Sequence, residues 1–137
     1  MATILCIDDN RSMLEIHQAL LESKGYRVLI APDGPTGLAL VRQQSIDVVV
    51  LDFNMPGMDG NQVAQVMRQE QPALPVVIWS GYPHEIPESL RWFAYAVLHK
   101  GDGLEGLLSV VENLVRAGGI SKDVEARGVS ASGRLSA

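Results

Sequence analysis

Two apolar runs that end in aspartate constrain the fold more than any other feature of this sequence. Residues 48–51 (VVVL) lead into Asp52, and residues 4–7 (ILCI) lead into the pair Asp8 and Asp9. Runs without polar alternation are typical of strands that are covered on both faces, as in a parallel sheet between two layers of helices. Because the carboxyl ends of parallel strands meet at one edge of the sheet, we expect these three carboxylates to lie close together there.

Two further apolar runs end in polar side chains of other kinds. Residues 75–79 (PVVIW) precede Ser80, and residues 95–99 (YAVLH) precede Lys100. The strand ends therefore carry carboxylates, a hydroxyl group and an ammonium group. Ligands of open α/β sheets bind beyond this edge of the sheet, so the polar residues lie where a binding site is expected.

Strands and helices alternate along most of the chain. The strands are predicted at residues 3–8, 26–31, 47–52, 75–80 and 94–98, and the helices at residues 11–24, 35–44, 61–69, 85–92 and 102–117. Short connections and right-handed crossovers between such units predict an α/β fold with three layers. The expected architecture is a doubly wound sheet of five parallel strands in the order 2-1-3-4-5, the flavodoxin-like arrangement.

Helical spacing predicts which side chains of the helices face the sheet. In the first helix, the residues at that spacing are Met13, Ile16 and Leu20. In the last helix, Asp102 is the predicted cap, and leucines and valines within residues 104–115 form the predicted buried stripe. The fourth helix is expected to be short, because prolines bracket its start.

The composition favours one soluble domain. The chain has 137 residues, of which 47% are hydrophobic, and its formal net charge is −5. This charge argues against direct binding of nucleic acid, which needs clustered Lys and Arg. No apolar run reaches the ~18 residues of a membrane-spanning helix, and the N-terminus lacks the features of a signal peptide. We therefore expect a cytoplasmic protein without a membrane partner.

The C-terminal residues differ in composition from the rest of the chain. Residues 118–137 contain few large apolar side chains and many small polar ones. Such a segment cannot bury enough surface to offset the entropy lost on ordering. We therefore expect a folded domain over residues 1–117 and a flexible tail or truncated linker over residues 118–137.

Each polar residue at a strand end has a simpler interpretation when it is considered alone. Asp9 is able to cap a helix, Ser80 to begin a turn, and Lys100 to be a solvated charge. Together these interpretations fail, because two carboxylates ~4 Å apart repel by roughly 4 kcal/mol at an effective dielectric constant near 20. Three carboxylates without a cation would strongly destabilise a domain whose total stability is about 5–15 kcal/mol.

The histidines and the cysteine show no comparable pattern. His17, His84 and His99 lack the spacing of metal ligands, and we expect them to have surface or packing roles. Cys6 is the only cysteine and lies inside the first apolar strand, where a small buried packing residue is expected.

Taken in order, the polar residues resemble a known family. The pair Asp8 and Asp9, Asp52 within LDFNMPGMDG, Ser80 within WSGY and Lys100 within VLHK resemble the receiver domain of bacterial response regulators, the phosphoacceptor half of two-component signalling. The resemblance extends over residues 2–117. It implies a signalling domain that catalyses only its own phosphorylation and dephosphorylation, rather than an enzyme that acts on other substrates.

The resemblance implies how a phosphoryl group would be held. Asp52 would accept this group from the phosphohistidine of a histidine kinase or a histidine phosphotransfer protein, forming an aspartyl phosphate. Lys100 and Ser80 would contact the phosphoryl oxygens. Backbone N–H groups near Asn54 and Gly81 would complete the cradle, since glycine allows close approach.

The resemblance also implies a magnesium site. Mg²⁺ would be held by Asp8, Asp9, Asp52 and the backbone carbonyl of Asn54, an oxygen-only set of the kind that this ion prefers. Three carboxylates, Lys100 and one Mg²⁺ sum to zero charge, whereas the phosphorylated site sums to about −1. The cation is therefore expected in both states.

Three positions bear on how the phosphorylated state is reported and how long it lasts. Many receivers have an aromatic residue three positions before the lysine as a conformational reporter, and here that residue is Val97. The lysine is commonly followed by proline in a cis peptide, but here Gly101 follows, so the next loop is expected to be more flexible. Tyr82 is expected to shield the phosphoryl group from water and to slow its hydrolysis.

Three hypotheses about the context of this domain remain open. The first is a phosphorylatable receiver that acts alone or in a phosphorelay and switches its binding to a downstream protein target. The second is a receiver cut from a hybrid sensor kinase or multidomain regulator, with residues 118–137 as the linker. The third is a receiver-like interaction module that works without phosphate, which Val97 and Gly101 favour and the complete acid set opposes. Oligomer formation is compatible with all three.

Overall fold

Five parallel strands form the sheet at the centre of the molecule. The computed structural model describes residues 1–126. Its strands are β1 (Thr3–Ile7), β2 (Arg27–Ala31), β3 (Val48–Asp52), β4 (Val76–Ser80) and β5 (Ala96–His99). Hydrogen bonding between neighbours is parallel throughout and gives the order β2-β1-β3-β4-β5. The predicted sheet and its strand order are confirmed.

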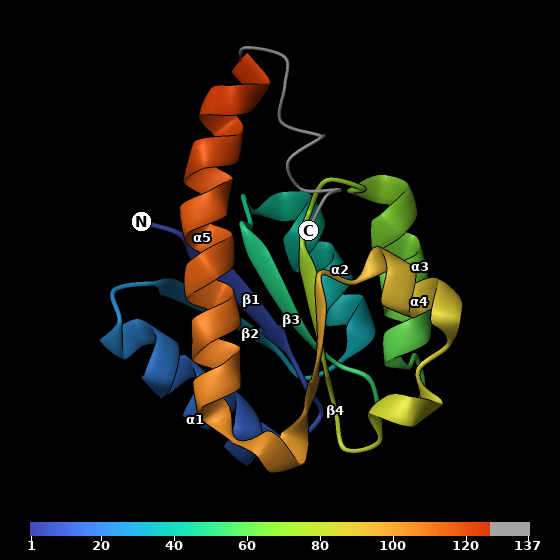
Figure 1. The fold of residues 1–137 in the computed structure, drawn as a ribbon. Coiled ribbons are helices and arrows are strands. Elements are labelled where there is room, and N and C mark those ends of the chain that lie inside the picture. The colour runs from blue at the N-terminus through green and yellow to red at the C-terminus, as the bar shows by residue number, and fades with distance from the viewer. Residues whose placement is uncertain (127–137) are drawn as a thin grey trace.

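Helices cover both faces of this sheet. The α-helices are α1 (Arg11–Ser23), α2 (Gly34–Gln43), α3 (Gly60–Glu70), α4 (Glu88–Phe93) and α5 (Leu104–Ala126), and two short 3₁₀ turns span Pro83–Glu85 and Lys100–Asp102. Figure 1 shows α1 and α5 against one face of the sheet and α2, α3 and α4 against the other. The three-layer α/β prediction is confirmed, and so is the short fourth helix.

Side chains along each strand alternate between two hydrophobic cores. From β1, Leu5 and Ile7 pack in the core shared with α2, α3 and α4, whereas Ile4 and Cys6 pack in the core shared with α1 and α5. Because both faces are covered, the strands consist of continuous apolar runs rather than alternating ones. Burial, assisted by the charge of Asp8, raises the pKa of the Cys6 thiol to about 12, so this predicted packing residue stays protonated.

Side-chain caps begin three of the helices directly after loops that leave strand ends. Asn10 accepts a hydrogen bond from the N–H of Met13 at 3.1 Å, so α1 begins immediately after the acidic pair. Asp33 caps α2 in the same way. Asp59 and Gln62 form a reciprocal capping box at the start of α3. These caps fix the loops at the carboxyl edge of the sheet.

The buried face of α1 lies one position further along the sequence than predicted. Its buried residues are Leu14, His17 and Leu21, whereas Ile16 is 45% exposed. The prediction is therefore wrong at Ile16. Its error arises from His17, a polar residue that occupies the centre of the buried stripe and hides its apolar periodicity.

The start of α5 also differs from its prediction. Asp102, the predicted cap, lies in the 3₁₀ turn, and Gly103, at a φ of 83°, separates it from the helix. Glycine adopts this left-handed conformation without a steric cost, so it lets the chain turn into the helix. The predicted stripe is confirmed in the first half of α5, where Leu107, Val111 and Leu114 are buried.

α5 extends beyond its predicted end. It continues to Ala126 rather than stopping at Ala117. A glycine in a helix interior costs ~1 kcal/mol but, unlike proline, leaves the backbone hydrogen bonds intact, so the two glycines after Ala117 do not stop the helix. The predicted tail from residue 127 onward lies outside the described residues. Within residues 1–126, none of the helices combines the length and apolar character needed to cross a membrane.

Candidate functional site

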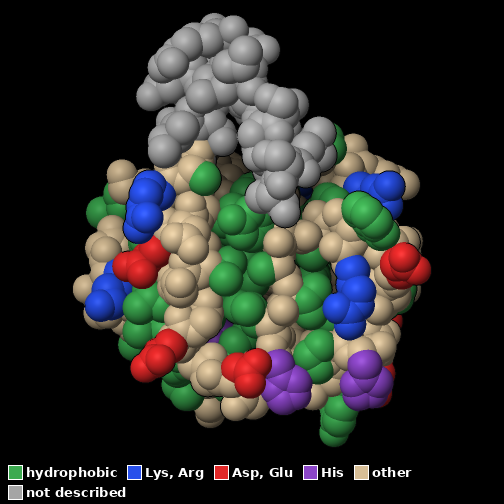
Figure 2. Space-filling view, viewed as in Figure 1, with side chains coloured by type: hydrophobic (Ala, Val, Ile, Leu, Met, Phe, Trp, Pro, Cys, Tyr) green, Lys and Arg blue, Asp and Glu red, His purple; other side chains and the backbone are tan. Residues whose placement is uncertain are grey.

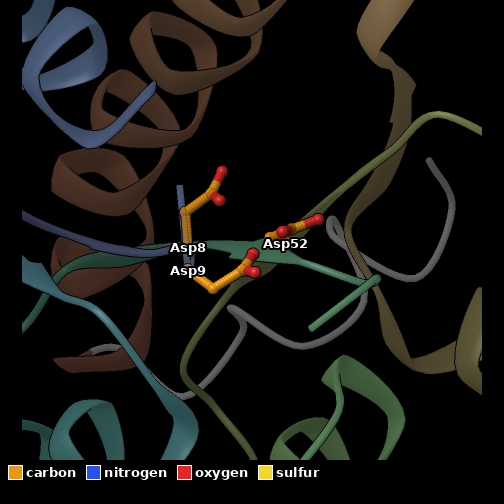
Figure 3. A group of neighbouring side chains, drawn as sticks. All are labelled: Asp8, Asp9 and Asp52. Atoms are coloured by element: carbon orange, nitrogen blue, oxygen red, sulfur yellow. The ribbon is translucent and has the colours of Figure 1, made fainter. Parts of the chain in front are cut away.

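The three predicted carboxylates converge at the carboxyl ends of β1 and β3. The chain passes from β1 to β2 on one side and returns to β3 on the other, so β1 and β3 flank the topological switch point of the sheet. Oxygen atoms of Asp8, Asp9 and Asp52 all lie within 4.8 Å of one another. Figure 3 shows the side chains leaving the two strand ends, with their carboxylates gathered in one place. The predicted proximity of these groups is confirmed.

Asp52 is buried and held at one of its two oxygens. The side chain is 1% exposed, and Oδ1 lies 2.9 Å from the Lys100 ammonium nitrogen. The backbone N–H of Asn54 donates to the same oxygen at 3.2 Å. Oδ2 has no hydrogen-bond partner among the residues that the structure describes. One oxygen is thus anchored, and the other is free to bind a ligand.

Burial makes the charged form of Asp52 costly. It raises the pKa of the carboxyl group to about 7, with Lys100 acting in the opposite direction and Asp8 adding to the increase. A carboxylate in this environment is stabilised by any cation that approaches its free oxygen. A further positive charge at this position would therefore stabilise the ionised form of Asp52.

Asp8 and Asp9 are adjacent in sequence but differ in exposure. Asp8 is buried; its Oδ1 accepts a hydrogen bond from the N–H of Asn10 at 2.9 Å, and its Oδ2 has no partner within the described part of the chain. Asp9 is exposed. Free oxygens on Asp8 and Asp52, together with the accessible carboxylate of Asp9, match the ligand preference of Mg²⁺. The donor set therefore fits this ion.

Ser80 connects the site to the loop that follows β4. Its hydroxyl is buried, donates to Oδ1 of Asn54 at 3.2 Å and accepts from the N–H of Tyr82 at 2.9 Å. The structure thus brings Ser80 and Asn54 together, with Gly81 half-buried next to them. One hydroxyl makes both contacts. A new ligand for Ser80 would therefore change a hydrogen bond to the β3–α3 loop and one to the β4–α4 loop.

The site opens to solvent at the end of the molecule where the strands end. Figure 2, in the same orientation as Figure 1, shows acidic and histidine side chains gathered at the lower end of this face. Lys100 is about one-third exposed at 32%. Tyr82 is 58% exposed, and its ring meets that of His84 edge-on with centroids 6.3 Å apart. Side chains beside the site are therefore accessible to solvent from this end.

Val97 lies apart from this constellation. It is half-buried on β5 and packs against the core shared with α2, α3 and α4. Trp79, on the neighbouring strand β4, packs in the opposite core. A role for Val97 in reporting phosphorylation stays a prediction.

A local contact beside Lys100 was not predicted from the sequence. Nδ1 of the His99 imidazole accepts a hydrogen bond from the N–H of Gly101 at 2.8 Å. A Cβ atom at position 101 would lie 2.6 Å from Cε1 and 2.7 Å from Nδ1 of this ring, so glycine permits the packing. The loop that was expected to be more flexible therefore has a constraint of its own.

Gly60 supports the backbone of Asp52. Its N–H donates to the carbonyl of Phe53 at 3.0 Å, and a Cβ atom there would lie 2.6 Å from Cα of Phe53 and 2.8 Å from the carbonyl oxygen of Asp52. The first residue of α3 thus packs against the backbone of Asp52 and Phe53. The sequence signal was the Asp-Gly step that ends the motif LDFNMPGMDG.

Arg91 ties the β4–α4 loop to α4. Its guanidinium group donates to the carbonyl oxygen of Ile86 at 3.3 Å and to that of Pro83. The 3₁₀ turn is thereby fastened to the short helix. One arginine on an exposed helix face carries no sequence signal for such a role, because the partners are backbone carbonyls.

Comparison with known families identifies the family of this chain. Residues 4–112 match the family model described as the response regulator receiver domain. The chain belongs to this family. It is therefore a signalling domain, the receiver of a two-component system.

Curated relatives match about half of this chain and differ in how much of their own length is matched. This chain is 38% identical over 79 residues to the sensor protein GacS of Pseudomonas syringae pv. syringae, and the match covers 54% of this chain and 9% of GacS. It is 41% identical over 80 residues to protein PilH of Pseudomonas aeruginosa, covering 57% of this chain and 66% of PilH. The matched segment thus spans a small part of GacS and just under two thirds of PilH.

Solved structures of response regulators have the same fold. TrrA of Thermotoga maritima, solved in complex with Mg(2+)-BeF, is 27% identical with a TM-score of 0.78, covering 83% of this chain and 99% of TrrA. TrrA has also been solved in complex with the histidine kinase ThkA. The agreement confirms the receiver fold.

Proposed function

We propose that this receiver takes a phosphoryl group onto Asp52 from the phosphohistidine of a histidine kinase or a histidine phosphotransfer protein. One observation carries the proposal: buried Asp52 pairs with Lys100 at 2.9 Å through Oδ1 and keeps Oδ2 free beside two other carboxylates. A purely structural aspartate has no need of a free buried oxygen among like charges. The complex of TrrA with a histidine kinase supports a partner of this kind.

Transfer of the phosphoryl group requires little covalent chemistry from the protein. An oxygen of Asp52 forms a bond to phosphorus while the bond from phosphorus to the partner's imidazole nitrogen breaks, and the released imidazole keeps that electron pair and takes up a proton from solvent. Negative charge is spread over the equatorial oxygens during transfer. Lys100 neutralises part of this charge, and the hydroxyl of Ser80 donates to one of these oxygens.

Mg²⁺ is the cofactor that the donor set fits. Asp8, Asp9, Asp52 and the backbone carbonyl of Asn54 would hold the ion, with water completing its octahedral shell. When bound, it supplies charge neutralisation for the carboxylates and the phosphoryl oxygens. The complex of TrrA with Mg(2+)-BeF supports this assignment.

Mg²⁺ binding should depend more on Asp9 than on Asp8. Asp9 is exposed and free to contact the ion directly, whereas one oxygen of Asp8 is already engaged by the N–H of Asn10. We expect Asp9→Ala to raise the Mg²⁺ dissociation constant about tenfold or more, as for losing a contact to a charged group worth ~1.5–3 kcal/mol. Asp8→Ala should have a smaller effect, and Asp102→Ala, outside the cluster, should have none. Calorimetric titration that ranked Asp8 above Asp9 would contradict this assignment.

We further propose that phosphorylation is reported through the β4–α4 loop. When Ser80 turns its hydroxyl towards the phosphoryl group, it gives up the side chain of Asn54, and its contact to the N–H of Tyr82 transmits the shift into the loop. The Arg91 contacts to two loop carbonyls carry this shift on to α4. The signal then reaches a downstream protein target by changing this face of the molecule.

Residues 80–92 should therefore show the largest response to phosphorylation. We expect their backbone amide resonances to move most on addition of a phosphoryl mimic with Mg²⁺, because few buried contacts restrain this segment. In Ser80→Ala the shifts should shrink, although Asp52 is unchanged. The idea is wrong if the largest shifts in the wild-type chain map to α2 and α3.

The phosphorylated state should be long-lived, and Tyr82 should be the reason. Its backbone N–H is bonded to Ser80, so the ring needs only side-chain rotation from its edge-on position beside His84 to cover the phosphoryl group. We expect the aspartyl phosphate to be hydrolysed several-fold faster in Tyr82→Ala than in the wild type. In Tyr82→Phe, which keeps the ring, the rate should resemble that of the wild type. Decay of labelled phosphate at saturating Mg²⁺ measures this. An unchanged or slower rate in Tyr82→Ala would show that the ring does not shield the bond.

The domain boundary is also part of the proposal. We infer that the receiver domain ends near Ala117 and that the later turns of α5, which project beyond the sheet in Figure 1, act as a connector.

A module that worked without phosphate would not need Asp52 to be both buried and free at one oxygen, so the phosphate-dependent function is the better supported one.

A further inference from the structure

His17 is a polar residue inside the apolar core between α1, α5 and the sheet. Its side chain is 1% exposed and lies on the buried stripe of α1 between Leu14 and Leu21. The ring meets that of Trp79 edge-on, with centroids 5.1 Å apart and an interplanar angle of 85°. Neither ring nitrogen of His17 has a hydrogen-bond partner among the described residues, and Nε1 of Trp79 has none there either.

Asp8 is the buried acid on the same side of the sheet. Side chains alternate along a strand, so Asp8 faces the core that contains Cys6 and Trp79. Its Oδ2 is also unpartnered within the described chain. Burial lowers the pKa of His17, while the charge of Asp8 raises it and that of Lys100 lowers it.

The unpartnered atoms are complementary as hydrogen-bonding groups. A neutral imidazole offers one donor and one acceptor, the indole of Trp79 offers a donor, and Oδ2 of Asp8 offers an acceptor. Each such group left buried and unpaired costs about 1–3 kcal/mol. Ordered water that makes about three hydrogen bonds satisfies groups of this kind in protein interiors. A buried water that hydrogen-bonds to His17, Trp79 and Asp8 would therefore satisfy these groups, which apolar packing alone would leave unpaired.

We propose that His17 is a positioning residue for Asp8. Its neutral imidazole, linked through buried water to Oδ2 of Asp8 and to the indole of Trp79, holds the carboxylate in the orientation that the cation site needs. A leucine would fill the same place on α1 but would leave Asp8 and Trp79 unpaired. The inference rests on the proposed function, since that function assigns Asp8 to the cation.

The bridge is tested first in the metal-free protein at neutral pH. Nitrogen-detected NMR should show a single tautomer of the His17 ring, and Asp8→Asn should shift both this ring and the Trp79 indole N–H. Asp9→Asn changes the adjacent exposed carboxylate and should leave both signals unchanged. Unmoved His17 and Trp79 signals in Asp8→Asn would overturn the proposal, whether or not the chain binds Mg²⁺ or accepts phosphate.

Mg²⁺ affinity provides the second test. His17→Leu should raise the dissociation constant severalfold, but by no more than Asp8→Ala does, because it acts only through that carboxylate. His17→Gln keeps a donor and an acceptor and should recover most of the affinity. Leu21→Ala removes packing from the same stripe of α1 and should leave the affinity unchanged.

The outcomes separate this inference from the proposed function. If Asp9→Ala weakens Mg²⁺ binding but His17→Leu does not, the positioning role of His17 is excluded and the cation site stands. If neither variant weakens binding, the cation site itself is misassigned. A loss in His17→Leu that His17→Gln does not recover would attribute the effect to packing and would also overturn the proposal.

Discussion

Asp52→Asn should abolish phosphorylation of the receiver. With acetyl phosphate and Mg²⁺, the wild-type chain should gain a single phosphoryl group, seen as one increment in its intact mass, and the variant should gain none. An amide keeps the shape of the side chain but is not a nucleophile for phosphorus, and it brings no charge to the cation. The loss should therefore be complete rather than partial.

Two controls make this result specific. Asp102→Asn changes an exposed aspartate at the same end of the molecule but outside the cluster, and it should be labelled like the wild type. Removal of Mg²⁺ with EDTA should stop labelling of the wild-type chain. Equal labelling of Asp52→Asn and the wild type would show that another residue accepts the phosphoryl group.

The metal-free receiver should lose stability as the pH rises towards neutrality. Burial raises the pKa of Asp52 from its ordinary value of 3.8 to about 7 in the folded chain. The folded state therefore binds this proton more tightly than the unfolded state, which stabilises the fold below pH 3.8. This contribution to the free energy of unfolding is lost as the pH rises from 3.8 to about 7. A shift of about three pKa units corresponds to a contribution of about 4 kcal/mol.

Urea unfolding of the wild type and Asp52→Asn in EDTA, from about pH 4 to about pH 8, isolates this contribution. The free energy of unfolding of the wild type should fall relative to that of the variant across this range, because asparagine does not titrate. At the upper end, Mg²⁺ should restore stability to the wild type by binding the folded state, and it should do so much less in the variant. A difference between the two proteins that does not change with pH would contradict the raised pKa.

The positions of Asp8 and Asp52 could be predicted because each follows an uninterrupted apolar run. Such a run indicates a strand covered on both faces, and parallel topology then brings the strand ends to one edge. Their hydrogen bonds could not be predicted in this way. Which oxygen of Asp52 meets Lys100, and which stays free, depends on side-chain packing between segments far apart in the sequence.

Other features escaped prediction because local pattern and tertiary packing disagree. His17 interrupts the apolar spacing of α1, so the pattern indicated a face shifted by one residue. The contact from Ser80 to Asn54 joins residues 26 positions apart and has no local signature. The glycines after Ala117 favour a helix end, whereas α5 continues through them.

The contact between His99 and Gly101 ties together two positions that would otherwise evolve independently. The imidazole occupies the space that any side chain at position 101 would need, and it binds the N–H that a proline there would lack. A side chain at position 101 would therefore displace the imidazole and break its hydrogen bond to the N–H. A chimaera that exchanges the segment around Lys100 keeps this contact only if both residues come from the same parent.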